Sequence, residues 1–146
     1  ESISKAGISV VVNDKERCKL PVLGSYYPGR DLIVICQQGA QPGDSEIKWS
    51  PSDFTVLMHE STHLLQDCRS GSIRDMQLVR ITSSEEELAE YIDILPEEYI
   101  QWIFKAYTEG GADDLTLQLE LEAFSTQLGA DPDVLAAAIS NTCSLI

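Results

Sequence analysis

The chain has 146 residues, and its 24 acidic side chains outnumber its 10 lysines and arginines, which gives a formal net charge of −14. Proteins bind nucleic acids and anionic membrane surfaces mainly through clustered Lys and Arg. We therefore expect neither to be a partner of this acidic chain. The apolar fraction of 43% is typical of a globular chain, and we expect one domain over residues 1–146. No signal or transmembrane segment is recognisable, so we expect a soluble protein of unknown location.

Strand signals are concentrated in about the first fifty residues. Short runs of β-branched residues predict strands at 8–12 and 32–36, and residues 47–49 offer a third. Pro28-Gly29 indicates a turn within residues 26–31, just before the second of these strands.

From residue 50 onward the spacing of apolar residues becomes helical. Ser50-Pro51 supplies an N-cap followed by proline at the first helical position, which predicts a helix over 51–69 with one buried apolar face. Further helices are predicted over 84–95, 96–109, 114–128 and from 131 towards the C-terminus, with a short strand near 76–81. The predicted fold class is therefore α+β, with a small N-terminal β-sheet, one well-capped helix and a mostly helical C-terminal part over 84–146.

Four cysteines stand far apart with no CxxC pair, which disfavours a cysteine-only zinc site or a thioredoxin-like motif. Two disulfides and four buried thiols are both compatible with the spacing. A bond between Cys68 and Cys143 would tie the end of helix 51–69 to the C-terminus, and the remaining two are Cys18 and Cys36.

The motif that carries chemistry is His59-Glu60-Ser61-Thr62-His63, an HExxH pattern inside the best-capped predicted helix. A spacing of four residues places both imidazoles on one helix face, one turn apart, where they can bind a single Zn²⁺. Glu60 points about 100° away from His59, so we expect it to act as general base towards a metal-bound water.

A zinc ion held by His59 and His63 needs a third protein ligand, which cannot be a histidine because these two are the only ones in the chain. Gln66 and Arg69 stand where the longer metzincin motif requires Gly and His, so that family is excluded. The third ligand is therefore expected to be a carboxylate. Asp67 could orient or ligate from the same helix, although a solvated side chain is the favoured interpretation.

The predicted helix 114–128 offers two carboxylates, Glu120 and Glu122. HExxH followed by a Glu-bearing helix resembles the gluzincin metallopeptidases, and the compact chain is similar to their minigluzincin forms. In that family the ligand Glu stands directly before Ala or three residues before it, and Ala123 suits either carboxylate. We favour Glu122, with Glu120 as the alternative. Thr126 stands where the family usually has an Asp that supports the first His.

The resemblance implies a zincin-like domain that hydrolyses peptide bonds in a peptide or protein substrate, with Glu60 moving the proton of a zinc-activated water. It also implies that strand 32–36 is an edge strand to which an extended peptide can be added. The oxyanion formed during hydrolysis needs a further donor, for which the candidates are Tyr27, Tyr91, Tyr99 and Tyr107.

Two other functions share the same residues. In one, the metal is structural, and the zincin-like domain is a non-catalytic binding module or a component of a larger assembly. In the other, the same metal ligands serve hydrolysis of a bond that is not a peptide bond. An open metal position would favour an enzyme, and a fourth protein ligand would favour a structural site.

Overall fold

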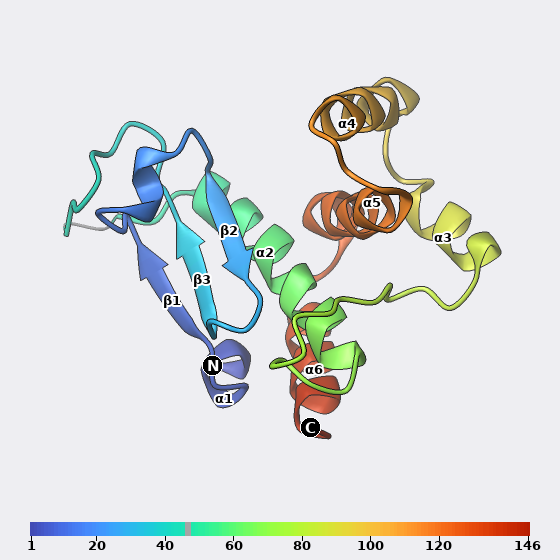
Figure 1. Ribbon diagram of the computed structural model, residues 1–146, viewed down its shortest axis with the longest axis horizontal. Coiled ribbons are helices and arrows are strands. Elements are labelled where there is room, and N and C mark those ends of the chain that lie inside the picture. The colour runs from blue at the N-terminus through green and yellow to red at the C-terminus, as the bar shows by residue number, and fades with distance from the viewer. Residues whose placement is uncertain (46–47) are drawn as a thin grey trace.

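The computed structural model describes residues 1–45 and 48–146 (Figure 1). Three strands form one sheet in the order β1-β3-β2, with β1 (Ser9–Val12) parallel and β2 (Gly24–Tyr27) antiparallel to β3 (Leu32–Ile35). The strands predicted at 8–12 and 32–36 are confirmed. However, β3 lies between the other two, so its expected place at the edge is wrong. Its run of Leu, Ile and Val suits a central strand, because Ile33, Val34 and Ile35 are all buried.

The edge strand beside the long helix is β2, which is not among the predicted strands. Tyr26 belongs to this strand rather than to the turn expected within residues 26–31. The turn is shorter than expected, with Gly29 at φ +76° directly after Pro28. The strand proposed at 47–49 lies partly outside the described residues, and 48–49 form no strand.

The long helix α2 (Pro51–Arg69) begins as predicted. Ser50 Oγ accepts a hydrogen bond from the Asp53 backbone N–H, and the Asp53 carboxylate accepts one from the Ser50 N–H. This capping box and Pro51 set the start of the helix. The segment 76–81 is irregular rather than a strand. The other helices are α1 (Ser2–Lys5), the 3₁₀ turn η1 (Arg17–Lys19), α3 (Glu85–Ile92), α4 (Glu97–Glu109), α5 (Asp114–Gly129) and α6 (Pro132–Cys143).

Helix α2 lies between the sheet and α5, and it also packs on α6 (Figure 1). Helices α3 and α4 contact the molecule through α5. Because α2 is enclosed in this way, every residue from His59 to Cys68 is buried, whereas Phe54 near its start is 58% exposed. The single apolar face predicted for this helix is therefore only part of what it buries.

Two clusters of buried apolar side chains hold these elements together. One joins the sheet, α2 and α6 around Ile33, Leu64 and Ile139, and the other joins α4 to α5 around Ile103 and Leu121. Both disulfides are formed, so the alternative of buried thiols is wrong. One joins Cys18 to Cys36, and the other joins Cys68 at the end of α2 to Cys143 at the end of α6. Among the described residues, no helix combines the length and apolar character needed to cross a membrane.

Candidate metal centre

The HExxH residues lie on the part of α2 that is enclosed by the sheet and α5. His59, Glu60 and His63 are each no more than 8% exposed. One ligand atom from each of these three side chains lies within 4.8 Å of the others, and the group could hold a metal ion. The two imidazole rings meet edge to face with their centroids 5.1 Å apart. The helical spacing thus brings both rings together, as predicted.

Helix α5 brings a carboxylate to both rings. Glu120 Oε2 lies 2.9 Å from His59 Nε2, and Glu120 Oε1 lies 3.0 Å from His63 Nε2. The Tyr107 hydroxyl, from the last part of α4, donates a hydrogen bond of 3.1 Å to Glu120 Oε2. Two imidazole nitrogens and one carboxylate therefore converge, which is a donor set typical of catalytic zinc sites.

Glu122, the favoured ligand, does not reach the histidines, whereas the alternative, Glu120, contacts both, so the geometry favours Glu120. Residues two apart on a helix point roughly 200° apart, and α5 is buried on more than one side. Leu117 and Leu121 pack towards α4, while Glu122 is fully buried against α2 and the segment before α3. Since α5 has no single apolar stripe, its periodicity could not distinguish the two carboxylates.

Each histidine also contacts a glutamine through its second ring nitrogen. His59 Nδ1 lies 2.6 Å from Gln127 Oε1, and His63 Nδ1 lies 2.7 Å from Gln66 Oε1. The His63 ring thus has an oxygen acceptor at both nitrogens, because the Gln66 amide nitrogen is engaged by Leu119 and Glu122, although a neutral imidazole carries only one N–H. Nε2 of His63 therefore faces Glu120 through a cation, which is either a proton or a metal ion. The residues present fit a metal on this ground.

The two glutamines were not predicted as site residues. Gln66 stands three residues after His63, so its place on the same helix face could have indicated a contact. Nothing in the sequence distinguishes Gln127. Thr126, expected near His59, instead hydrogen-bonds with Tyr91 and donates to the Glu122 carbonyl.

The charges in the site depend on one another. Burial by itself would lower the pKa of His63, but the hydrogen bond and charge of Glu120 outweigh it and raise the pKa to about 9. Burial would favour a neutral Glu120, yet hydrogen bonds from both histidines hold its pKa well below the usual range. Burial raises the pKa of Glu60, and the nearby histidines offset only part of that rise. In the metal-free chain, a protonated His63 is therefore paired with ionised Glu120.

Of the four tyrosines considered as oxyanion donors, Tyr107 is the one that contacts this cluster. Burial and the Glu120 charge raise the pKa of Tyr107, so its phenol stays protonated. Tyr27 lies under the Arg17 guanidinium, Tyr91 bonds with Thr126, and Tyr99 packs on Phe124. Asp67 is fully buried rather than solvated, and it accepts a 2.6 Å hydrogen bond from the Tyr26 hydroxyl.

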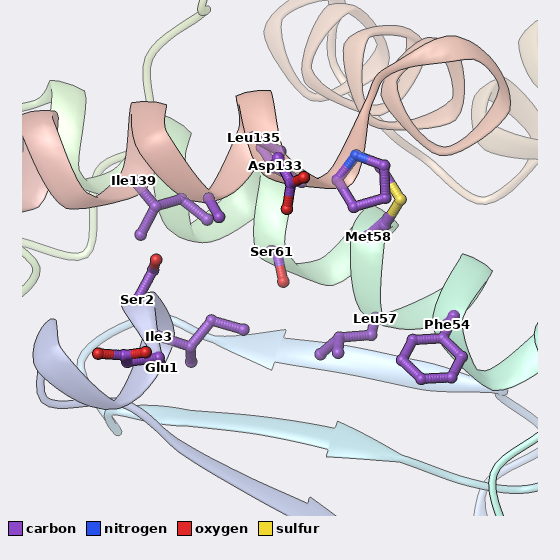
Figure 2. A pocket seen from close by; sticks show the side chains of 12 residues that line it. Glu1, Ser2, Ile3, Phe54, Leu57, Met58, Ser61, Asp133, Leu135 and Ile139 are labelled. Carbon is purple, nitrogen blue, oxygen red and sulfur yellow. The ribbon is translucent and has the colours of Figure 1, made fainter.

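Two of the cavities that adjoin α2 lie on opposite sides of the helix. One, of about 560 Å³, reaches His63 and Glu120 and is bordered by Leu78, Val79 and Leu119. The other, of about 490 Å³, lies between α1, α2 and α6, where Ser61 and Leu57 face Ile3 and Ile139 (Figure 2). Ser61 projects from the helix side opposite the two histidines. Of these two cavities, the first is therefore the one that reaches the candidate metal ligands.

Comparison with protein-family models, with curated proteins and with solved structures gives no match.

Proposed function

We propose that this chain is a zinc-dependent peptidase with a zincin-like fold, in which His59, His63 and Glu120 hold the metal and Glu60 is the general base. The observation that carries this proposal is the contact of one α5 carboxylate with both Nε2 atoms of the HExxH motif. A chance motif on a helix would not require a carboxylate from a distant helix at both rings. The Tyr107 hydrogen bond supports the same orientation of Glu120.

Glu60 suits the role of general base because of its position beside the histidines and because it is buried. Its carboxylate lies beside both imidazoles, and burial raises its pKa towards the range in which a carboxylate exchanges protons near neutrality. A bound zinc would lower the pKa of a water and polarise the substrate carbonyl. Glu60 would take the proton of the attacking water and transfer it to the leaving amine.

Substrate would lie along β2. This strand pairs with β3 alone within the described sheet, and on its other edge the Tyr26 N–H hydrogen-bonds to Glu60, so a peptide strand added there would run beside the base. A Cβ built on Gly24 would lie 3.3 Å from Glu60 Cγ, which shows how close the strand is to the base. The neighbouring cavity, bordered by Leu78, Val79 and Leu119, offers space for an apolar side chain of the peptide.

The proposal is tested by metal content and peptide hydrolysis measured on the same preparations. We expect about one zinc per chain in the wild type and in Glu60→Gln, because the substitution leaves the three ligands in place. Hydrolysis of a mixed peptide library should fall by about 10² to 10⁴-fold in Glu60→Gln, since the base is lost. Glu98→Gln, at an exposed position of α4, is the matched control and should behave as wild type.

Two results would contradict the proposal. Failure to bind zinc when the metal is offered would remove the site itself. Zinc binding without hydrolysis of any peptide in the library would favour the alternative of a structural or binding module.

A further inference from the structure

We propose that Glu122 is a positioning residue. It holds the Gln66 side chain so that the amide oxygen orients His63 towards the metal. It also anchors the segment before α3, which borders the cavity at His63. This inference rests on the proposed function, because it concerns a ligand of the same metal. It gives a role to a carboxylate that lies in the core yet does not reach the histidines.

The first step is the orientation of Gln66, which is fully buried. Its Nε2 donates to the Leu119 carbonyl and to Glu122 Oε1, each at 3.0 Å. Both partners can only accept, so the amide nitrogen must face them, and Oε1 must face His63 Nδ1 at 2.7 Å. Nδ1 of His63 therefore carries the proton, and the lone pair of its Nε2 is left for a metal.

The second step is that Glu122 is held in place from several sides. In addition to Gln66, its carboxylate accepts hydrogen bonds from the Ile81 N–H and the Thr82 N–H at 2.8 Å and from the Thr82 hydroxyl at 2.6 Å. Four donors satisfy a carboxylate that is fully buried. Among the described residues, no cationic side chain forms an ion pair with it. The position of Glu122 is thus fixed by hydrogen bonds from two elements.

The third step concerns the segment just before Ile81. The Val79 N–H donates to the Gln66 carbonyl at 3.1 Å, and Leu78 and Val79 border the cavity that reaches His63. Glu122 and Gln66 therefore hold this segment to the helices on either side of Arg80, whose carbonyl also accepts a hydrogen bond from Arg69 Nε at 3.0 Å. The Glu122 carboxylate therefore supports the orientation of His63, through Gln66, and also anchors the segment that forms one wall of the cavity.

The other histidine provides a contrast within the same site. His59 Nδ1 faces Gln127 Oε1 at 2.6 Å. Within the described parts of the chain, the Gln127 amide nitrogen has no hydrogen bond that would fix its orientation, and its side chain is only partly buried. The positioning role is accordingly assigned to Glu122 and Gln66, on the His63 side.

The test uses zinc affinity of the full chain, measured by competition with a chromophoric chelator. We expect Gln66→Met and Glu122→Gln each to raise the zinc Kd by roughly 10 to 100-fold, the range typical of residues that orient a metal ligand. The double variant should be little weaker than either single one, because both changes remove the same support. Thr82→Val removes one donor to Glu122 on the loop side and leaves the Gln66 contact, so it should raise the zinc Kd less than either of these changes. Gln101→Met, at an exposed position of α4, is the matched control and should leave the zinc Kd within about twofold.

A spectroscopic readout separates orientation from loss of stability. With only two histidines in the chain, ¹⁵N NMR of the imidazoles resolves two rings. We expect a slowly exchanging Nδ1–H signal for His63 in the zinc-loaded wild type and in Thr82→Val. The signal should be lost in Gln66→Met while that of His59 remains.

Equal weakening of zinc binding by Thr82→Val and Gln66→Met would overturn the positioning role and leave Glu122 as a structural anchor alone. Persistence of the His63 signal in Gln66→Met would overturn it as well. A wild type that binds no zinc would instead contradict the proposed function. In that case the same signal, measured on metal-free wild type and Gln66→Met, decides whether Gln66 holds the ring.

Discussion

Glu120 is the only residue of α5 within the described chain whose carboxylate meets both motif histidines, so its removal should have the largest effect on the metal. We expect Glu120→Ala to weaken zinc binding by more than 100-fold, and Glu122→Ala to weaken it less, because Glu122 acts through Gln66. Zinc titration of the two variants beside exposed Glu109→Ala checks this order. A larger loss in Glu122→Ala would return the ligand assignment to the residue favoured by sequence alone.

The pair of His63 and Glu120 also predicts how stability of the metal-free chain depends on pH. The pKa of His63 is raised from 6.5 to about 9, so its contribution is complete below pH 6.5 and is lost as pH rises through 9. The pKa of Glu120 is lowered from 4.5, so its contribution is present above pH 4.5 and is lost as pH falls further. The pair therefore contributes most to stability between pH 4.5 and pH 6.5.

Thermal unfolding of the metal-free chain from pH 5.5 to 9.5 measures this effect. We expect the Tm of the wild type to fall over this range relative to that of Glu120→Gln, which lacks the charge. Added zinc should reverse the trend, because the metal requires a deprotonated His63. Parallel curves for the two metal-free proteins would show that the pair contributes nothing to folding.

The site residues that the sequence predicts are those whose relative positions depend on a single helix. His59, Glu60 and His63 follow from spacing within α2, and the Ser50 cap places its start. The choice between Glu120 and Glu122 depends on how α5 is rotated between its neighbours. That rotation is set by packing on both sides, which a pattern of apolar residues along one helix does not encode.

At the scale of elements, β2 and α2 pack closely at Gly24. A Cβ at this position would lie 2.5 Å from Val56 Cγ1 and 3.1 Å from the Val34 carbonyl oxygen, in addition to its approach to Glu60. Gly24→Ala should therefore push the strand away from the helix. We expect a loss of about 1 to 3 kcal/mol in the free energy of unfolding, which is typical of overpacking, together with reduced kcat/KM for peptides.

Chemical denaturation and peptide hydrolysis measure the two effects, with the neighbouring Ser25→Ala as control. Wild-type activity in Gly24→Ala would show that the strand does not position Glu60 or the substrate.

The composition of the strands explains why the sequence predicts β3, and not β2, as the edge strand. The β-branched run of β3 is the stronger strand signal because the strand is buried, whereas β2 consists of Gly, Ser and Tyr and is only half-buried.

Across the whole molecule, the contacts of Glu120 with His59 and His63 join α5 to α2, while the disulfide between Cys68 and Cys143 joins α2 to α6. The disulfide closes a sequence separation of 75 residues, for which chain entropy gives a stabilisation of about 4 kcal/mol. The double substitution Cys68→Ser/Cys143→Ser should lower the free energy of unfolding by about this amount. Its effect on zinc affinity should be small, because His59, His63 and Glu120 are held by contacts between α2 and α5.

The second disulfide offers the comparison for this prediction. Cys18→Ser/Cys36→Ser opens a separation of 18 residues, and chain entropy gives a smaller loss of about 3 kcal/mol. Denaturation and zinc titration of both double variants would show whether the two properties separate. If loss of the Cys68–Cys143 bond weakens zinc binding as strongly as it lowers stability, the orientation of α2 towards α5 depends on α6 as well. If zinc binding persists, the two helices that carry the ligands and the Glu122 anchor hold the metal centre without that bond.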